Sequence, residues 1–415
     1  MRLADLIVER LSTRRLAVLI VAVLAGNAAT VAHVGSTAGE ASAKSANAVV
    51  TATSAATGNT TSPATAGKTT SPPAKAGNTA TTAAEGGTTG NTAPASTNAR
   101  LSPSQLKLVN YFPSTAAQGL FWSRWSPTVV DTDFGVISQT LRANAVRVFV
   151  PTDQFGWPTP SGDHTEQLAQ LVSLAAEHGL GVYLDLFNDF VPNSDIEASK
   201  QWAATVLASY VGDPRIVTIE VENEINPSNP TAVTWARAMI PYVRQIDGEI
   251  PVAISVCGCD NPGTLQILRT ALGTSQPDVY DFHYYPDSNA NPTPMQAQDT
   301  SPGSIEVTFR RATAIVTPAT LIVAETGLST YYPGTPDFPG ATSDTRWEQT
   351  QASYFTKVEQ AAAASGIAPA APWGYIDVAY GGGVTDTRQR FFGIFRSDGT
   401  PKPAASVIAQ TFGTT

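Results

Sequence analysis

Two glutamates, each at the end of a short apolar run, are the residues with the clearest chemical potential in this sequence. Glu224 follows Thr-Ile-Glu-Val-Glu-Asn at 218–223, and Glu325 follows Leu-Ile-Val-Ala at 321–324. A β-branched run that ends in a carboxylate is typical of a buried strand whose last residue reaches a reactive surface. A single carboxylate rarely acts alone on a neutral, stable substrate, whereas a protonated and an ionised carboxyl together can supply an acid and a nucleophile. Glu224 and Glu325 are therefore the candidate pair.

The elements that must position this pair form a repeating pattern after residue 101. A short apolar run, a polar turn and an amphipathic helical segment recur, and the expected strands are 106–111, 145–150, 181–187, 216–222, 251–256, 279–283, 321–324 and 371–375. Eight such rounds over about 310 residues predict an α/β fold of the (β/α)8 TIM barrel type. A doubly wound open sheet is the alternative, but it does not need the eighth strand. No glycine-rich phosphate loop follows any of these runs, which argues against nucleotide binding.

The first hundred residues have a different character. Several arginines precede the apolar run 16–25, as in an export signal, so 1–34 is predicted to be a signal peptide or an N-terminal membrane anchor. Residues 35–100 are rich in Thr, Ala, Gly, Ser and Pro and carry few charges, so a disordered linker is expected there. The catalytic domain is expected at 101–415. The protein should therefore be secreted or displayed at the cell surface.

The charge and the rare residues limit the partners. A net charge of −9, from 25 basic and 34 acidic residues, argues against binding to nucleic acid. Two cysteines and four histidines offer little for a metal site, so we expect neither metal nor cofactor. We also expect a monomer. Cys257 and Cys259 are close enough in sequence for a strained local disulfide, which in an exported protein we favour over two thiols.

Other polar and aromatic residues also lie at predicted strand ends. In a β/α barrel the reactive groups gather at the carboxyl ends of the strands, and the residues there are Arg147, Asn223, Glu224, His283, Tyr285, Glu325 and Trp373. Three β/α rounds separate the two glutamates, so their strands should lie across the barrel mouth from each other. Retaining glycoside hydrolysis requires two carboxyls about 5–5.5 Å apart, one protonated and one ionised. We expect Arg147 and Tyr285 to keep Glu325 ionised, and the charge of Glu325 to hold the proton on Glu224.

Five motifs in order at barrel spacing resemble a known group of enzymes. They are Asn-Glu at 223–224, His-Tyr-Tyr at 283–285, Ala-Glu-Thr at 324–326, Phe-Gly-Ile-Phe-Arg at 392–396 and Asp-Gly-Thr-Pro-Lys-Pro at 398–403. Together they resemble the clan A glycoside hydrolases, most closely the family 5 cellulases and mannanases, over about 106–410. The resemblance implies a retaining glycosidase that acts on a β-linked polysaccharide or oligosaccharide.

The same resemblance implies a role for each site residue. Glu224 would be the acid/base and Glu325 the nucleophile of a double displacement. Asn223 would hold the sugar 2-hydroxyl, and Trp373 would form the floor of the site. Arg147 and Tyr285 would orient Glu325, and His283 would line the site. One departure is Asp-Leu-Phe at 185–187, where the family usually has Asp-Leu-His, so a hydrogen bond to substrate is lost at Phe187.

Three questions remain open from the sequence. Glu220, Glu222 and Glu224 share one parity on a regular strand and could form an interior acidic row, and for Glu220 we adopt that interpretation. Regular alternation would also point Asn223 away from the site, unless the strand bulges or ends there. The alternative function is a barrel that binds a cell-envelope glycan without cutting it.

Overall fold

In the computed structural model, seven strands of the described part of the chain pair in parallel and in sequence order. The structure describes residues 100–188, 194–258, 261–285, 302–317, 320–331 and 343–415. The strands are β1 (Leu108–Asn110), β2 (Ala145–Phe149), β3 (Gly181–Asp185), β4 (Ile216–Glu220), β5 (Val252–Cys257), β6 (Val279–His283) and β7 (Leu321–Ile322). The predicted signal or anchor at 1–34 and the linker at 35–100, apart from Arg100, lie outside the described residues, as does Cys259.

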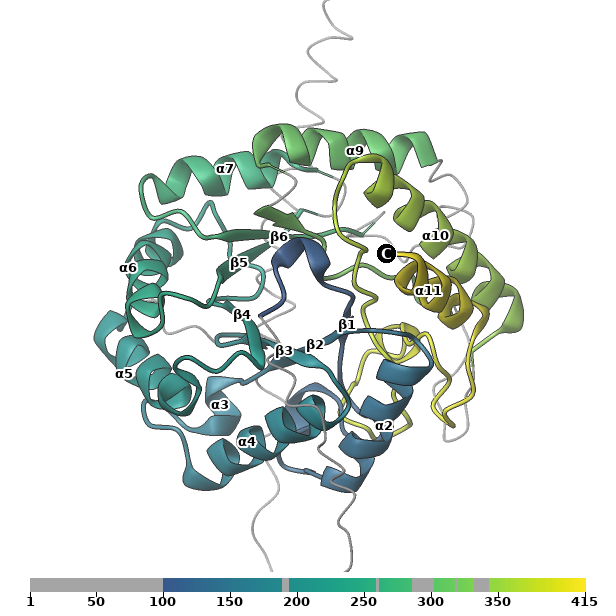
Figure 1. The fold of residues 1–415 in the computed structure, drawn as a ribbon, viewed down its shortest axis with the longest axis horizontal. Coiled ribbons are helices and arrows are strands. Elements are labelled where there is room, and N and C mark those ends of the chain that lie inside the picture. Colours follow the sequence, from purple (N-terminus) through teal and green to yellow (C-terminus); the bar gives the residue numbers. More distant parts are fainter. Residues whose placement is uncertain (1–99, 189–193, 259–260, 286–301, 318–319, 332–342) are drawn as a thin grey trace, which may run out of the picture. The chain divides into compact units, whose positions relative to one another are not determined.

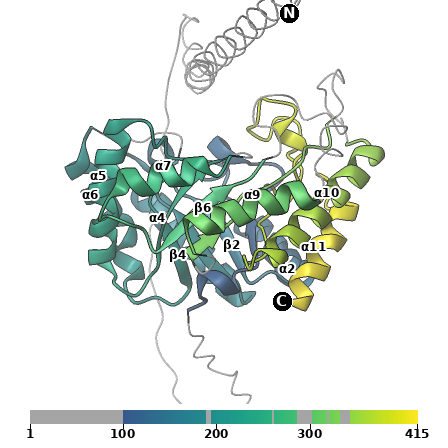
Figure 2. The ribbon, with the colours of Figure 1, turned by 90° about the horizontal axis from the view of Figure 1, so that it is seen from above.

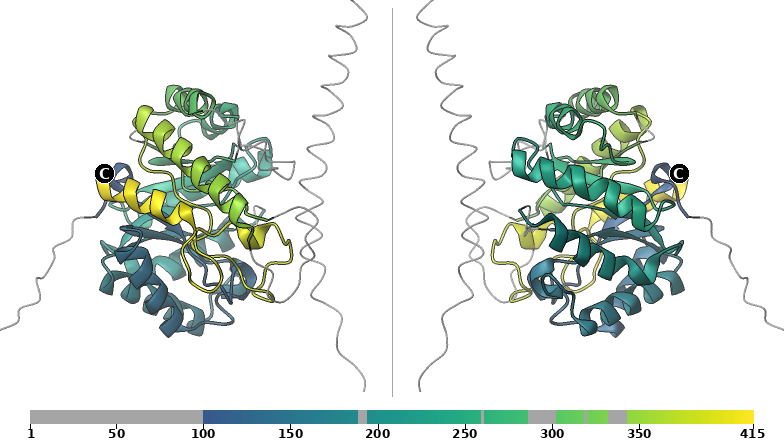
Figure 3. Two further views of the ribbon diagram at one scale, coloured as in Figure 1. Left: turned by 90° about the vertical axis from the view of Figure 1, so that its right-hand side faces the viewer. Right: turned by 90° about the vertical axis from the view of Figure 1, so that its left-hand side faces the viewer.

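Helices lie around the outside of the sheet, as Figures 1 and 2 show from two directions. They are α2 (Pro127–Gln139), α3 (Thr152–Phe155), α4 (Gly162–Glu177), α5 (Ile196–Leu207), α6 (Pro230–Ile246), α7 (Gly263–Leu272), α9 (Pro302–Ile315), α10 (Thr345–Ala364) and α11 (Pro403–Thr414). The two C-terminal helices, α10 and α11, lie side by side (Figure 3). Among the described helices, none is both long and apolar enough to span a membrane.

The predicted eighth strand, 371–375, is not a regular strand. Its backbone nevertheless bonds on both sides, because Trp373 N donates to the Thr326 carbonyl beyond β7 (2.7 Å) and Tyr375 N donates to the Asn110 carbonyl of β1 (3.1 Å). A regular ladder fails here because Pro372 has no N–H and Gly374 adopts a φ of 88°. The parallel sheet thus curls until its two edges meet across an irregular segment, which is consistent with a TIM barrel.

Side chains alternate between the two faces of the curled sheet. Outward positions such as Val146 and Val148 join the large apolar core under the helices. Inward positions near the start of the strands, such as Leu108 and Ala145, form a separate small apolar cluster. The next inward positions along the same strands are polar, for example Arg147 and Asp281, and they are fully buried. The barrel interior therefore changes from apolar to ionisable toward the carboxyl ends of the strands.

A β-bulge sets the register of β4. Val182 pairs with Ile216, but Tyr183 pairs with Thr218, so Val217 is an extra residue on β4. Beyond this bulge Asp185 lies opposite Glu220. The bulge therefore decides which residues of β4 face the interior acids of the neighbouring strand.

The helix that follows the site segment begins at a side-chain cap. The side-chain oxygen of Asn229 accepts hydrogen bonds from Thr231 N (3.0 Å) and Ala232 N (3.4 Å) at the start of α6.

Replacing Asn229 by alanine should lower the free energy of unfolding by about 1 kcal/mol, because these backbone donors lose their acceptor. Urea denaturation checks this. The exposed Thr234→Ala on the same helix is the control, expected to stay within about 0.5 kcal/mol of the wild type, and equal effects of the two variants would contradict the capping role.

Candidate active site

Arg147 of β2 is the centre of the buried polar layer. Its Nε donates to Glu220 (2.7 Å), and its Nη1 donates to Glu325 (2.5 Å) and to Asn110 (3.0 Å). Its Nη2 donates to the side-chain oxygen of Asn223 (2.8 Å). One fully buried guanidinium thus binds residues of β1 and β4 and of the segments that follow β4 and β7, and it fixes these parts relative to one another.

Glu325 follows β7 and is held on both carboxylate oxygens. Oε1 accepts from Arg147, and Oε2 accepts from the Tyr285 hydroxyl (3.1 Å). Its side chain is only 6% exposed. The sequence-based placement of Arg147 and Tyr285 beside Glu325 is found in the structure, and both groups donate to the carboxylate.

Glu224 lies beyond the end of β4 in a backbone conformation that interrupts the strand. Its φ is 53°, in the left-handed region that residues other than glycine rarely adopt, and its N–H donates to the Ser255 hydroxyl of β5 (2.6 Å). Because β4 ends at Glu220, alternation does not continue, and Asn223 points to Arg147 rather than away from it. Asn223 was expected to reach the site only if the strand bulges or ends before it, and the strand does end before it.

His283, the last residue of β6, lies between the two glutamates. Its Nδ1 is 2.9 Å from Glu224 Oε1 and 3.4 Å from Glu325 Oε2. A carboxylate oxygen of Glu224 and one of Glu325 lie within 4.8 Å of each other. The two carboxyls therefore face each other at short range, with the Glu224 side chain 36% exposed and the Glu325 side chain nearly covered.

The pKa shifts of the two glutamates differ from the sequence-based expectation. Burial acts to raise the pKa of Glu224, but the hydrogen bond and the charge of His283 outweigh it, and the pKa of Glu224 is lowered. Burial raises the pKa of Glu325 in spite of the opposing charges of His283 and Arg147. In the free protein these two directions are opposite to those expected for a protonated Glu224 and an ionised Glu325, because motif spacing carries no information on how closely His283 approaches Glu224.

The other acids of the site segment lie in the interior. Glu220 binds Arg147, as the interior interpretation expected, and Glu222 is buried beside it. Burial, together with the charge of Glu220, raises the pKa of Glu222 to about 8, so this carboxyl is mainly protonated at neutral pH. Asp185 lies 3.8 Å from Arg147 Nη2, and burial raises its pKa well above the usual range.

Aromatic residues gather beside Arg147 at the closing segment. Trp373 packs edge-on against Phe112 and Phe149 at centroid distances of 6.1 and 6.0 Å, and the Arg147 guanidinium lies 4.5 Å from the centroid of Phe149. Trp373 is only partly buried, whereas Trp122 is fully buried in the core. Of these two tryptophans, Trp373 has the exposure that contact with a ligand requires.

Several residues in the site were not selected from the sequence. Phe187, at the departure from the family motif, packs against Trp202 and Trp235 in the core, and the next residue, Asn188, accepts a hydrogen bond from the Asn223 amide (2.9 Å). Asn110 and Ser255 also contact site residues. Their available signal was their position at or near the ends of β1, β3 and β5.

Cys257 ends β5 opposite His283 in the strand register. A hydrogen bond with Cys257 acts, along with the larger influence of His283, to lower the pKa of Glu224. The predicted pairing of Cys257 with Cys259 lies outside the described residues, because the position of Cys259 is not described.

Two sets of described carboxylate and imidazole groups are close enough to be considered for metal binding. They are Glu220 with Asp281 and His283, and Glu224 with His283 and Glu325. In the second set the Glu325 oxygens already accept from Arg147 and Tyr285, and Glu224 Oε1 pairs with His283. These atoms thus form a hydrogen-bonded acid and imidazole cluster within the protein.

Comparison with known proteins identifies the family of the chain. Residues 99–366 match the model of the cellulase family, glycosyl hydrolase family 5. Endoglucanase CelA of Streptomyces lividans is 25% identical over 211 residues, which are 47% of this chain and 45% of that enzyme. The chain thus spans less than half of the length of this curated relative.

Solved structures share the fold at low sequence identity. A GH5_18 protein from Streptomyces cattleya, in complex with GlcNAc, superposes with a TM-score of 0.55 at 18% identity, covering 76% of this chain and 80% of that one. An exo-β-1,4-mannosidase from Opitutaceae bacterium strain TAV5 gives 0.55 at 16% identity, covering 74% and 59%. With a family match over more than half of its length, the chain belongs to glycosyl hydrolase family 5.

Proposed function

We propose that this protein is an exported, retaining glycoside hydrolase that cleaves β-linked glycans by double displacement. Membership of glycosyl hydrolase family 5 supports hydrolysis of glycosidic bonds as the activity. The observation that carries the mechanism is the approach of Glu224 and Glu325 within 4.8 Å. Inverting enzymes need about 6.5–9.5 Å between their carboxyls to admit a water, whereas retaining enzymes need only about 5–5.5 Å.

The surroundings of the two glutamates support different roles. Glu325 is nearly covered and fixed by Arg147 and Tyr285, which suits a nucleophile that must attack along one direction. Glu224 is more exposed and reaches toward solvent, which suits an acid/base that meets first the leaving oxygen and then a water.

The remaining site residues would bind the sugar around this pair. Asn223, held by Arg147 and Asn188, would present its amide to the sugar hydroxyl next to the anomeric carbon. Trp373 offers a partly exposed ring to the C–H face of a sugar. His283 and Tyr285 would line the site from β6.

The predicted N-terminal signal supports export, and the predicted linker would then separate the enzyme from any anchor. The described domain would act outside the cytoplasm on a polymeric or oligomeric glycan, as a monomer. Fractionation of cells that produce the full chain would test this location.

A panel of glycans tests the activity. Purified protein should release reducing ends from at least one of β-glucan, β-mannan, β-xylan and a cell-envelope glycan. Binding to a glycan on this panel without release of any product would instead favour the glycan-binding barrel and contradict the hydrolase.

Replacing Glu224 by glutamine should separate its acid role from binding. Hydrolysis of an unactivated glycan should fall by about 10²–10⁴-fold, because the leaving oxygen loses its proton donor. The first step with a dinitrophenyl glycoside should fall far less, since that leaving group departs without a proton. Steady-state and pre-steady-state rates with the two substrates check this.

Glu222→Gln is the matched control for this experiment. Glu222 is buried beside Glu220 and its pKa is about 8, so glutamine closely imitates its state at neutral pH. Its rates should stay within about threefold of the wild type, equivalent to less than 1 kcal/mol in the barrier. Equal losses with both substrates in Glu224→Gln would count against Glu224 as the proton donor.

A further inference from the structure

Both ring nitrogens of His283 face carboxylates. Nδ1 lies 2.9 Å from Glu224 and 3.4 Å from Glu325, and Nε2 lies 3.6 Å from Asp281 Oδ2. The side chain is fully buried. With Glu224 and Asp281 ionised, a ring nitrogen without a proton would direct its lone pair at a carboxylate oxygen, and the two would repel each other. The geometry therefore favours a proton on each nitrogen, which makes His283 an imidazolium.

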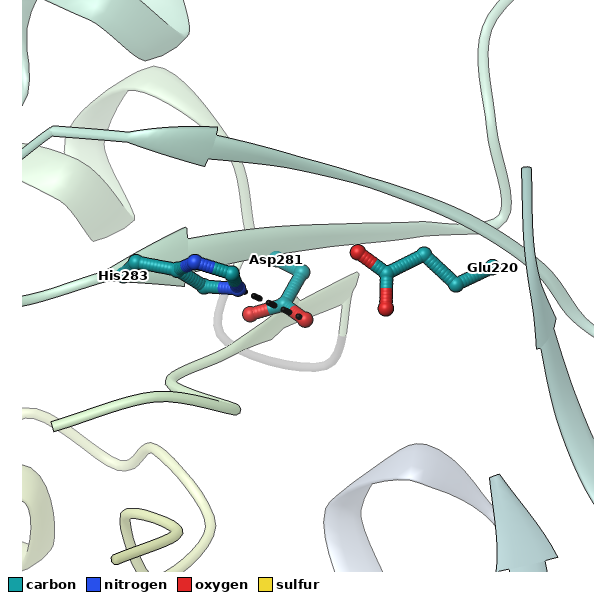
Figure 4. Close-up of side chains that lie close together, drawn as sticks. All are labelled: Glu220, Asp281 and His283. Atoms are coloured by element: carbon teal, nitrogen blue, oxygen red, sulfur yellow. Dashed lines mark ion pairs between the residues drawn. The ribbon is translucent and has the colours of Figure 1, made fainter. Parts of the chain in front are cut away.

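Asp281 is held firmly beneath this imidazolium. Its Oδ1 accepts from Ala324 N (2.9 Å), and its Oδ2 accepts from the Tyr183 hydroxyl (3.2 Å). Figure 4 shows the imidazole of His283 with Asp281 beside it and the carboxyl of Glu220 directed at the same place. The carboxylate of Asp281 thus stays on the Nε2 side of the ring, whereas Glu224 and Glu325 lie on the Nδ1 side.

The charged and titratable groups around His283 come from every neighbouring strand. They are Arg147 of β2, Tyr183 of β3, Glu220 and Glu224 of β4 and its extension, Cys257 of β5, Asp281 and Tyr285 of β6 and its extension, and Glu325 after β7. Burial acts to lower the pKa of His283, but the charges of Glu325 and Asp281 and the bond to Glu224 outweigh it and raise that pKa well above the usual value. The same hydrogen bond and the charge of His283 lower the pKa of Glu224.

We propose that Asp281, His283 and Glu224 form a proton relay, in which His283 Nδ1 holds the proton that Glu224 passes to the leaving group. The inference rests on the proposed function, and it resolves the reversed pKa order of the two glutamates. Glu224 does not need to store a proton in the free site, because its hydrogen-bonded neighbour stores it.

The relay has two proton transfers. First, the Nδ1–H bond of His283 breaks as an O–H bond forms on Glu224, which leaves a neutral imidazole whose Nε2–H stays directed at Asp281. Next, the O–H bond of Glu224 breaks as its proton moves to the glycosidic oxygen. The C–O bond breaks with its electron pair going to that oxygen, while Glu325 bonds to the anomeric carbon. In the second half both proton transfers run in reverse. A water gives one proton to Glu224 as its oxygen bonds to the anomeric carbon, and the bond from that carbon to Glu325 breaks with its electron pair returning to the carboxylate. Glu224 then passes the proton back to His283 Nδ1, which restores the imidazolium.

Asp281 acts in this relay as a positioning residue. It touches neither the sugar nor the acid, but its charge stabilises the protonated ring and its place fixes the proton on Nε2. Nε2 is 3.6 Å from Asp281 Oδ2, an ion-pair distance without a direct hydrogen bond, so Asp281 acts on the remaining Nε2 proton through its charge.

The test is a titration of the histidine side chains of the full chain by NMR with ¹⁵N-labelled histidine. The sequence holds four histidines, and substitution of the others one at a time by glutamine assigns the His283 signal. In the wild type the His283 ring should be doubly protonated at neutral pH. A neutral ring there would overturn the proposal. Because this readout needs no substrate, it stands or fails independently of whether any glycan is cleaved.

Two variants then separate charge from packing. Asp281→Asn should make the protonation constant of His283 at least about tenfold smaller, a change of about one pKa unit. Asp278→Asn, at an exposed aspartate just before β6 that pairs with Arg244 (3.0 Å), should leave it unchanged. An unchanged His283 titration in a folded Asp281→Asn would overturn the role of Asp281. Should that variant fail to fold, the wild-type titration still decides whether His283 carries the proton.

Activity supplies a further readout on whichever glycan is cleaved. Asp281→Asn should lower kcat for unactivated glycans more than for dinitrophenyl glycosides, with KM little changed. A uniform loss for both leaving groups would indicate a structural role and would contradict the relay.

Discussion

Replacing Glu325 by alanine is expected to reduce hydrolysis of every accepted glycan by about 10⁴-fold or more, the upper end of what a single acid or base contributes. Without this carboxylate the covalent intermediate loses its proposed nucleophile. The loss should appear in kcat rather than in KM, because Glu325 contacts protein groups in the free site and bonds to the sugar only during reaction. Steady-state rates of the purified variant measure it.

Sodium azide provides the control for the Glu325→Ala experiment. The shortened side chain leaves room for azide, which should attack from the vacated side and yield a glycosyl azide of inverted configuration. Recovery of turnover by azide would show that the rest of the site is intact. Wild-type rates in a folded Glu325→Ala variant would contradict the assignment of the nucleophile.

Replacing Arg147 by methionine should cause the largest loss of stability among the site variants, about 3–5 kcal/mol at neutral pH. The guanidinium is fully buried and compensates Glu220, Glu325 and Asp185 at 2.7, 2.5 and 3.8 Å. Methionine fills part of the volume but leaves these acids without their cation. Chemical denaturation measures the loss. The exposed Arg310→Met, whose pair with Glu306 is largely solvated, should change stability by less than about 1 kcal/mol.

The pH dependence of this loss has a defined sign. Burial already raises the pKa values of Asp185, Glu220 and Glu325, and removal of Arg147 would raise them further. A carboxyl whose pKa is raised in the folded state contributes stability below its unfolded pKa and loses it as pH rises through the folded pKa. The deficit of Arg147→Met should therefore be smaller at pH 4 than at pH 7. A deficit of the same size at both pH values would show that Arg147 acts mainly through packing, because packing does not depend on protonation.

The sequence predicted the positions of the first seven strands because each is a short, mainly apolar run buried on both faces. It could not predict the irregular closing segment, where Pro372 and Gly374 break the strand while backbone bonds to Thr326 and Asn110 remain. An apolar run indicates that a segment is buried. Whether it also forms regular strand hydrogen bonds depends here on the missing N–H of Pro372 and the positive φ of Gly374.

The candidate site could be predicted as a set of residues but not as a set of charges. Motif spacing brought Glu224, Glu325 and Arg147 together because the carboxyl ends of parallel strands converge. The reversed pKa order depends on His283 lying 2.9 Å from Glu224, and that distance depends on the positive φ of Glu224 and its support by Ser255. Such side-chain geometry is set by tertiary contacts between β4, β5 and β6 and has no local signature.

The same limit explains Asn188. The motif comparison identified a lost histidine at Phe187, whose ring belongs to the core beside Trp202. It could not show that the following residue supplies a polar group to Asn223. At the end of a strand, a shift of one residue changes which side chain points into the site. Sequence position alone does not show whether such a shift occurs.

The configuration of the first product tests the central claim most directly. Proton NMR can follow the anomeric signals as the enzyme begins to cleave a β-linked substrate, before mutarotation mixes the two anomers. The close approach of Glu224 and Glu325 predicts that the β anomer appears first. Initial formation of the α anomer would contradict double displacement at this pair of carboxylates.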